Sequence, residues 1–399
     1  MPVQPQDAAS YPLPCQPLAG VGLHFSSLPS PYGIGDIGDA ARSFIDGLVE
    51  MNIRVWQFLP TGPTAYGDSP YQPLSVFAGN ENLIGLEPLV RAGLLADVEL
   101  EPLLTLPRDS VDYGALIPRK RQLLDLAASR FEARADDTMK AAFTDFVERF
   151  DEAWLADYAV YRVLKSLFQE RPWPEWPAMY VRRDSAAMAR IRQREATAIR
   201  RYKLLQFFFA QQWRRLKAHA SEQEVGLFGD MPIYIALDSA DAWAHPEILC
   251  IDENGTPSHV AGVPPDYFSD DGQLWGNPLY DWAQQAANGY GWWIDRVAHA
   301  VQQFDLIRID HFRGFEAYWS VPFGETTARN GCWEPGPGDD LFLALHSALG
   351  PVPIVAEDLG VITPAVDALR HRFHIPGMVV LQFAVDDPEF DPDTIDPHS

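Results

Sequence analysis

The sequence predicts an α/β fold of the TIM-type (β/α)8 barrel. Short apolar strands alternate with amphipathic helical segments, a chain of 399 residues is long enough for one large barrel, and acidic residues follow several of the strands. Hydrophobic residues make up 47% of the chain and charged residues 22%, so a large core can form and bulk disorder is excluded. The alternation alone also fits an open parallel sheet.

The N-terminal part predicts a βαβ unit. Residues 1–20 are rich in proline and predict a loose arm. An apolar start, a loop of Gly, Pro and Ser, a helix over 39–50 and a strand over 53–59 follow. The next loop, 61–80, is long, and long loops within compact domains usually carry function.

The middle of the chain changes character. Amphipathic segments rich in Ala, Arg and Leu dominate from about 110 to 220 and predict a mainly helical insertion. We therefore expect the start of the barrel, with its substrate loop, over 1–110, the helical insertion over 111–220, and the rest of the barrel over 221–399.

After residue 225 the alternation of strands and helices returns. The apolar runs predict strands over 227–236, 304–310, 351–357 and 378–384. Helices are expected near 291–303, 338–349 and 364–372.

The charge balance excludes some classes of partner. A net charge of −24 repels phosphate backbones and anionic membranes, so we expect neither nucleic acid nor a membrane as a partner. Neutral sugars are unaffected, and the aromatic content of 12% suits sugar rings as well as it suits a core.

Cysteine usage and the N-terminal sequence predict a reducing cytoplasm. The three cysteines, Cys15, Cys250 and Cys332, are widely spaced and odd in number, which indicates neither a disulfide framework nor a Cys-type zinc site. The first residues lack a basic segment followed by an apolar one, and no apolar run approaches membrane-spanning length. Neither a metal nor an organic cofactor is indicated.

Three of the predicted strands end in an acid. Asp230, Asp310 and Glu357 each lie in a polar and aromatic neighbourhood, and catalytic groups of a (β/α)8 barrel lie at the carboxyl ends of its strands. For any one of them a helix cap or a loop acid is the alternative. Three together favour a catalytic site.

The neighbours assign different roles to two of these acids. Arg308 lies two residues before Asp310 and points to the same side, where it can keep this carboxylate ionised as a nucleophile requires. Glu357 follows an apolar strand, where burial raises the pKa towards that of a general acid. His311 is equally well a scaffold histidine, and it lacks the spaced partners of a metal ligand.

Eight strings resemble one enzyme family, in order and with matching spacing. The chain resembles the amylomaltases, or disproportionating enzymes, of glycoside hydrolase family 77 in the α-amylase superfamily. The resemblance implies a (β/α)8 barrel that transfers a segment of a 1,4-α-glucan to the 4-OH of an acceptor glucose or glucan. The strings are PYGIGDIG (31–38), WQFLPTGPTAYGDSPYQ (56–72), FAGNENLI (77–84), GDMPIYIALDSADAW (229–243), VAGVPPDYFSDDGQLWGNPLYDW (260–282), LIRIDHFRGFEAYWSVP (306–322), AEDLGVITP (356–364) and PGMVVLQFA (376–384).

The resemblance also implies roles for single residues. Asp310 matches the nucleophile, Glu357 the general acid/base, and Arg308 the arginine beside the nucleophile. Maltooligosaccharides and other 1,4-α-glucans are the implied partners, without a cofactor. The implied sugar-binding residues are Ser69, Tyr71, Asp230, Asp266, Gln273, Trp275 and His311, with Tyr66 at a second glucan-binding position. Loop packing is the alternative for Tyr66, Tyr71 and Trp275.

Two departures from the family pattern stand out. Ala65 replaces a glycine before the GDSPYQ loop, which strains the loop if that position needs a positive φ. A Thr-His-Asp-Asn-Asp motif with a third catalytic Asp is absent from the sequence, which ends in FDPDTIDPHS. The chain therefore looks truncated at its C-terminus, and we expect it to be poorly soluble or inactive alone. Robust maltotriose disproportionation by the isolated chain would contradict this.

Three other readings differ in class. A retaining α-glucan hydrolase shortens its substrates, whereas a transferase makes longer and shorter products. A non-catalytic glucan-binding form would survive the loss of Asp310. A nucleotide-binding doubly wound domain is disfavoured because no Gly-rich phosphate loop follows a strand. The oligomeric state is left open.

Overall fold

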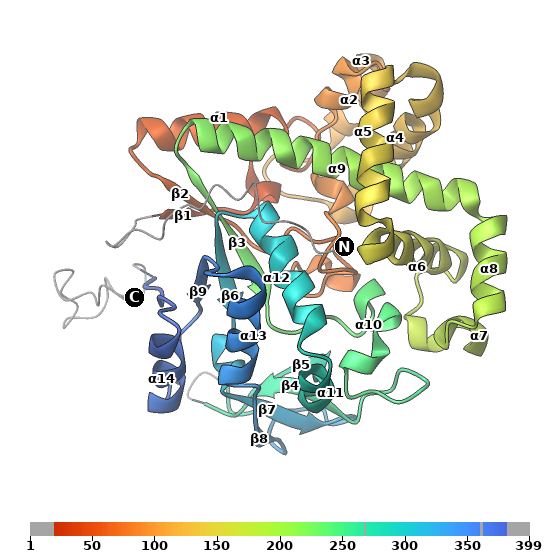
Figure 1. Cartoon of the computed structure of the whole chain (residues 1–399). Helices are drawn as coiled ribbons and strands as arrows, with labels where there is room; N and C mark the ends of the chain where they lie inside the picture. The colour runs from red at the N-terminus through yellow and green to blue at the C-terminus, as the bar shows by residue number, and fades with distance from the viewer. Residues whose placement is uncertain (1–19, 267–268, 360–361, 381–399) are drawn as a thin grey trace.

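The computed structural model describes residues 20–266, 269–359 and 362–380, and its centre is a parallel sheet. All neighbouring strands in it run parallel, in the order β1-β2-β3-β6-β9, with β1 and β9 at the edges of the described sheet (Figure 1). The strands are β1 (Gly20–Gly22), β2 (Val55–Gln57), β3 (Gly226–Pro232), β6 (Leu306–Asp310) and β9 (Ile354–Ala356).

Helices cover the outside of this sheet and bury its strands. Every residue of β3 is buried, as expected for a strand of a parallel sheet that is covered on both faces. The predicted helices over 39–50, 291–303 and 364–372 are confirmed with the same bounds, and the one expected from 338 begins one residue later. These helices are α1 (Asp39–Glu50), α12 (Gly291–Gln303), α13 (Asp339–Leu349) and α14 (Pro364–Arg372).

The segment between β2 and β3 is mainly helical, as predicted for 110–220. It occupies the upper and right-hand side of Figure 1, and the long helix α9 runs back across the top of the sheet towards β3. Aspartates begin three of its helices, because the side chains of Asp112, Asp136 and Asp184 accept backbone N–H groups that have no partner within the helix. The helices are α2 (Glu87–Arg91), α3 (Asp97–Leu100), α4 (Tyr113–Arg134), α5 (Asp137–Phe150), α6 (Ala156–Leu167), α7 (Ala178–Val181), α8 (Ser185–Arg194) and α9 (Ala196–Glu222).

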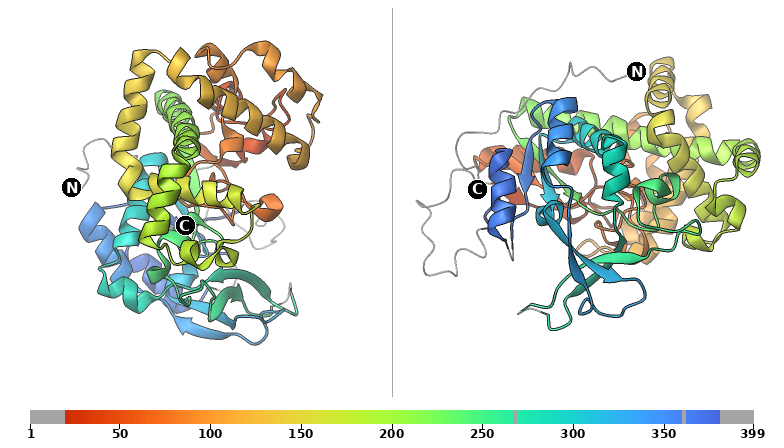
Figure 2. Two further views of the ribbon diagram at one scale, coloured as in Figure 1. Left: turned by 90° about the vertical axis from the view of Figure 1, so that its right-hand side faces the viewer. Right: turned by 60° about the horizontal axis from the view of Figure 1, so that its bottom comes forward.

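A small antiparallel sheet, which the sequence reading missed, lies below the parallel sheet (Figures 1 and 2). Its order is β5-β4-β7-β8, and β6 leads into it through the short helix η8 (Phe312–Phe315), so it extends the carboxyl end of the parallel sheet. Residues 260–275 include parts of two of its strands, β4 and β5. The strands are β4 (His259–Val263), β5 (Gln273–Pro278), β7 (Ala317–Pro322) and β8 (Cys332–Pro335), with α10 (Ala240–Ala244) and α11 (Trp282–Ala287) nearby in sequence.

Two strand predictions need correction. β3 stops at Pro232 rather than continuing to 236, because Pro232 pairs with Asp310, the last residue of the neighbouring strand β6, and nothing extends the ladder. The strand expected over 378–384 is not formed by 378–380, and its other residues lie outside the described residues.

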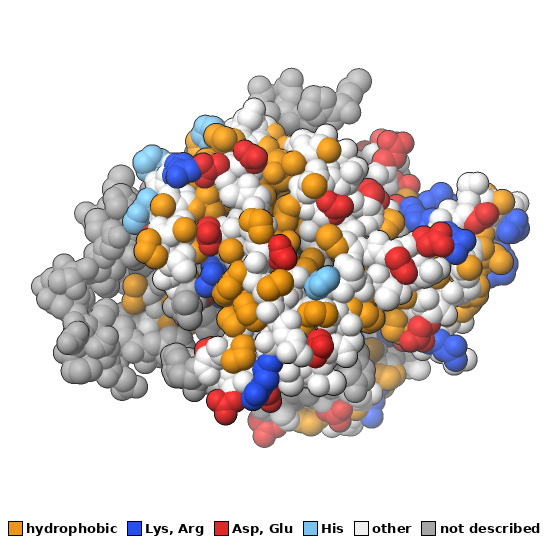
Figure 3. All heavy atoms as spheres, turned by 90° about the horizontal axis from the view of Figure 1, so that it is seen from below, with side chains coloured by type: hydrophobic (Ala, Val, Ile, Leu, Met, Phe, Trp, Pro, Cys, Tyr) orange, Lys and Arg blue, Asp and Glu red, His pale blue; other side chains and the backbone are white. Residues whose placement is uncertain are grey.

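The surface reflects the acidic composition. On the face seen from below, Asp and Glu side chains are scattered among apolar side chains (Figure 3). No helix among the described residues is long and apolar enough to cross a membrane.

Replacement of Gly35 by alanine should destabilise the fold. An added Cβ would lie 2.1 Å from the carbonyl oxygen of Phe25 and 2.7 Å from the backbone nitrogen of Leu28, so backbone has to move. We expect Gly35→Ala to lower the free energy of unfolding by about 1–3 kcal/mol, as overpacking typically does, and to lower the melting temperature.

Gly47→Ala is the matched control. An added Cβ at Gly47 meets nothing within 4 Å, and the position lies inside α1. Alanine is favoured over glycine in a helix by up to about 1 kcal/mol, so the melting temperature should stay the same or rise. A Gly35→Ala chain that melts with the parent would contradict the described packing.

Candidate active site

The strand register brings four charged side chains to the carboxyl ends of three adjacent strands. Asp230 on β3 pairs with Arg308 on β6, and Asp310 ends β6. Glu357 directly follows β9, whose last residue pairs with the residue before Asp310. Residues at the same level of parallel neighbours, and residues two apart on one strand, face the same side, so all four side chains share one face.

Arg308 joins two of these carboxylates. Its Nη1 lies 2.7 Å from Oδ1 of Asp230 and 2.7 Å from Oδ1 of Asp310, which confirms the ion pair expected between Arg308 and Asp310. The hydroxyl of Tyr71 donates to the other oxygen of Asp230 at 2.8 Å. The Asp230 side chain is only 2% exposed but that of Asp310 is 30% exposed, so Asp310 is the one open to a ligand.

Burial governs the protonation of the Asp230 side of this cluster. It raises the pKa of Asp230 to about 6; the negative charge of Asp310 acts in the same direction, whereas Arg308 and the Tyr71 hydrogen bond oppose it. Burial also raises the pKa of Tyr71, so its hydroxyl stays protonated and acts as a donor. Burial lowers the pKa of Arg308, but its two carboxylate partners outweigh this and raise it above the ordinary value.

Glu357 is held by backbone groups. Its Oε1 accepts the N–H of Leu359 at 2.8 Å and its Oε2 accepts the N–H of His311 at 3.0 Å. Burial raises its pKa, with a smaller contribution from Asp310, against the lowering effect of the two N–H groups and of Arg308. The direction predicted for Glu357 is therefore confirmed.

His311 has an unusual backbone and a buried ring. Its φ of 55° lies in the left-handed region, which costs a residue other than glycine about 1–3 kcal/mol, and this turn directs its N–H to Glu357. The ring packs edge-on against Trp275 with 4.8 Å between centroids. Burial, with the charge of Arg313, lowers its pKa to about 3, so the imidazole is neutral near pH 7. Its Nε2 has no hydrogen-bond partner among the described residues.

The loop 61–80 contributes Tyr71 to the cluster, and its backbone at Ala65 is not in the left-handed region. Ser69 Oγ accepts the N–H of Tyr71 at 3.3 Å, so Ser69 shapes the turn that presents Tyr71. Ala65 has φ −104°, outside the left-handed region, so the condition under which replacing a glycine would strain the loop is not met. Tyr66 begins the short helix η2 (Tyr66–Asp68), and its side chain lies outside the described part of the structure.

Three more of the predicted sugar-binding residues, Asp266, Gln273 and Trp275, lie on β5 and the turn before it. Trp275 Nε1 donates to Gln273 Oε1 at 3.1 Å, and both residues belong to β5. Asp266 lies between β4 and β5, where its Oδ1 accepts the N–H of Ser269 at 2.9 Å. Trp275 therefore joins the cluster through His311, whereas the contact described for Asp266 folds the turn.

Three residues that the sequence reading did not single out hold the loop 61–80. Asp241 accepts the Val76 N–H at 2.8 Å, and burial raises its pKa to about 6. Gln72 donates to Asn277 of β5 at 2.9 Å. Gln72 follows Tyr71 and Asn277 lies two residues after Trp275, so both lie inside strings that resemble the family. A hydrogen bond between residues 205 positions apart nevertheless leaves no local pattern in a sequence.

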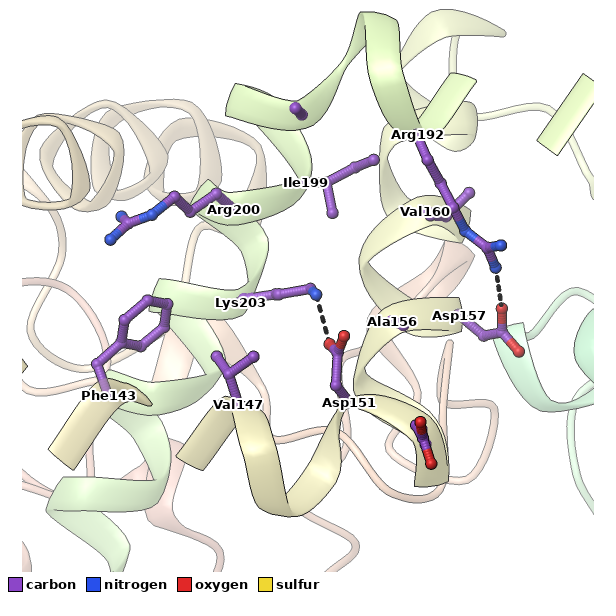
Figure 4. Close-up of a pocket in the computed structure, with 12 residues that line it drawn as sticks. Phe143, Val147, Asp151, Ala156, Asp157, Val160, Arg192, Ile199, Arg200 and Lys203 are labelled. Atoms are coloured by element: carbon purple, nitrogen blue, oxygen red, sulfur yellow. Dashed lines mark hydrogen bonds and ion pairs between the residues drawn. The ribbon is translucent and has the colours of Figure 1, made fainter. Parts of the chain in front are cut away.

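A groove of about 700 Å³ lies in the helical segment and is separate from this cluster (Figure 4). Its charged groups pair with one another: Lys203 with Asp151, and Arg192 with Asp157 at 3.2 Å. None of its lining residues belongs to the strand-end cluster. Within 20–266, 269–359 and 362–380, no group of three His, Cys, Asp or Glu side chains could hold a metal ion.

Comparisons with known proteins agree on one family. The family model described as 4-alpha-glucanotransferase matches residues 23–399. The 4-alpha-glucanotransferases of Thermus thermophilus and of Synechocystis sp. are 48% identical over 368 residues and 47% identical over 372 residues, and each match covers 92% of this chain and 73% of that protein. A solved amylomaltase from Streptococcus agalactiae, in complex with acarbose, superposes with a TM-score of 0.89 at 37% identity, covering 94% of this chain and 76% of that one.

Removal of the Asp230 charge should stabilise the chain in a pH-dependent way. The pKa of Asp230 rises from 3.8 when unfolded to about 6 when folded, so the folded state opposes its ionisation, and this destabilisation is fully present only above pH 6. At pH 8 we expect Asp230→Asn to have a higher melting temperature than the parent and a free energy of unfolding that is higher by on the order of 1–3 kcal/mol. This difference should disappear as the pH falls from 6 to 4.

Glu253→Gln removes one negative charge at an exposed position, where the side chain is 72% exposed, and controls for net charge. Its gap from the parent should stay small at every pH. A gap for Asp230→Asn that widens towards pH 4 would contradict the assigned direction.

Proposed function

The chain belongs to glycoside hydrolase family 77 and is a 4-α-glucanotransferase, and from that premise we propose that Asp310 is its nucleophile and Glu357 its general acid/base. The observation that carries these roles is the arrangement of the two carboxylates at the same level of neighbouring strands. Such strands lie about 4.8 Å apart, which favours the close carboxyl pair of a retaining enzyme over the wider pair of an inverting one, about 6.5–9.5 Å.

In the first step, Glu357 donates its proton to the glycosidic oxygen as Asp310 attacks the anomeric carbon. The raised pKa of Glu357 supports its role as the proton donor, and the ion pair with Arg308 orients the carboxylate of Asp310 for attack. A covalent glycosyl-enzyme forms and the first product leaves.

In the second step, Glu357 acts as a base. It removes a proton from the 4-OH of an acceptor glucan, whose oxygen displaces Asp310 and restores the α-configuration. Trp275 lies beside the ring of His311, and we assign it with Gln273 and Asp266 to the acceptor side. Acceptor sugar in this position excludes water, so transfer prevails over hydrolysis.

The other residues of the cluster bind and orient sugar in this proposal. Asp230 is sealed by Tyr71 and Arg308, so in this proposal it orients these two groups beside the donor sugar. The buried Nε2 of His311 is a further partner for a sugar hydroxyl. Ser69 shapes the loop under the donor sugar, and Tyr66 stays assigned to a second glucan position.

The proposed substrates are maltooligosaccharides and other 1,4-α-glucans, and the proposed location is the cytoplasm. The Streptococcus agalactiae amylomaltase was solved in complex with acarbose, which supports a sugar ligand for this chain. Two free thiols, Cys250 and Cys332, suit a reducing compartment. The barrel start over 1–110, the helical insertion over 111–220 and the rest of the barrel from 221 remain the proposed division of the chain.

Two substitutions separate the proposed roles. Asp310→Asn removes the nucleophile, so covalent glycosylation should fall by several orders of magnitude with every donor. Glu357→Gln removes the proton donor, so a maltooligosaccharide donor should fail but a glucosyl fluoride donor should still form the covalent intermediate, because fluoride leaves without protonation. Mass spectrometry of the intact chain measures this intermediate.

Which of the two variants forms the covalent adduct from the fluoride donor decides the assignment. If Asp310→Asn forms the covalent adduct from the fluoride donor but Glu357→Gln does not, the two roles are exchanged. Melting curves that overlay those of the parent exclude unfolding as the cause.

Maltotriose products distinguish transfer from hydrolysis. Transfer gives a ladder of longer and shorter maltodextrins plus glucose, with little gain in reducing ends, since transfer conserves glycosidic bonds. No products at all would agree with the expectation stated above that the chain is inactive alone. Products that are only shorter than maltotriose, with a matching gain in reducing ends, would favour the hydrolase alternative.

A further inference from the structure

A pair of side-chain amides joins two parts of the site that lie far apart in the sequence. Nε2 of Gln72 donates to Oδ1 of Asn277 at 2.9 Å and to the carbonyl oxygen of Trp275 at 3.4 Å. Nδ2 of Asn277 in turn donates to the carbonyl oxygen of Ile235, beyond the end of β3, at 2.9 Å. Asn277 is buried, so its amide depends on these partners.

Each member of this amide pair lies close in sequence to a residue that the proposed function assigns to the donor or the acceptor side. Gln72 directly follows Tyr71, whose hydroxyl bonds Asp230 on the donor side. Asn277 lies two residues after Trp275 on the same strand, β5. The amide pair therefore links the donor loop to the acceptor strand.

β5 depends on such a link because it is an edge strand. It pairs with β4 on one side, no other strand of the described residues borders it, and its register with β4 shifts between Val260 and Gly262. Gly276 next to Trp275 has φ +78°, which interrupts the regular strand. Edge strands with few backbone bonds open at low cost, so side-chain ties decide how firmly Trp275 is held.

We propose that Gln72 and Asn277 are positioning residues that lock the acceptor strand to the donor loop, and that this lock sets how the glycosyl-enzyme partitions between acceptor sugar and water. The inference rests on the proposed function, because it takes Tyr71 as donor-side and Trp275 as acceptor-side. Loss of the lock leaves Asp310 and Glu357 in place, since Arg308 and the backbone of β6 and β9 hold them. Water then reaches the intermediate more often while the acceptor binds more weakly.

The test compares Gln72→Ala and Gln72→Met with the parent on maltotriose. Hydrolysis adds a reducing end and transfer does not, so the ratio of new reducing ends to glucose released gives the partition. We expect the hydrolysed fraction and the KM for added acceptor glucose to rise several-fold in both variants, while total turnover stays within the same order of magnitude. A high acceptor concentration should restore transfer.

Gln284→Ala is the control, because Gln284 is exposed on α11 and lies outside both β5 and the loop 61–80. It should leave both partition and turnover unchanged. A fall in turnover with an unchanged partition in the Gln72 variants overturns the inference and leaves the proposed function standing. A parent chain that only hydrolyses overturns the proposed function, and the inference with it.

Hydrogen exchange gives a readout that does not need turnover. In Gln72→Met, backbone amides of β5 (Gln273–Pro278) and of the loop 61–80 should exchange faster than in the parent, while those of β6 should not change. Unchanged exchange in β5 overturns the proposed lock, whether or not the variant is active.

Discussion

The site depends on one guanidinium group placed between two carboxylates. Arg308 bonds Asp230, which is almost fully buried, and Asp310, which is partly open, through the same nitrogen. A buried carboxylate without such a partner would take up a proton, and two carboxylates this close would repel each other. The parallel register of β3 and β6 places Arg308 beside Asp230, so the cluster follows from strand pairing rather than from loop conformation.

Three acids of similar chemistry thus acquire different environments. Asp230 is sealed under Tyr71, Asp310 is left accessible, and Glu357 is partly buried and oriented by two N–H groups. The fold differentiates them through depth and through the identity of the neighbours. A two-step displacement needs such different environments, because one carboxylate has to bond to carbon while another has to transfer a proton.

The sequence predicts those parts of the molecule that depend on local patterns. Gly38 precedes α1, Gly350 follows α13, and the Thr363 hydroxyl caps the start of α14. Glycine and threonine are recognisable signals of helix ends, and these helices were predicted to within one residue. Strand-end acids are equally visible. The antiparallel sheet is not, because its strands are short and contain Gly and Pro, and because β4 pairs with β7 between residues 57 to 63 positions apart. The sequence also did not predict that the N–H of His311 bonds Glu357 or that the amide of Gln72 bonds Asn277. A left-handed turn at a histidine and a contact between distant residues leave no sequence pattern.

The left-handed backbone at His311 also affects how this site can change by mutation. The bond to Glu357 comes from a peptide N–H, which every amino acid except proline supplies. Substitutions at 311 can therefore vary the ring that packs on Trp275 without depriving the acid of its donor, and a glycine would even relieve the conformational cost. The ring at this position and the N–H that orients Glu357 are therefore encoded separately in one residue. In the proposed site, substrate preference can thus change by substitution at 311 while the orientation of Glu357 stays the same.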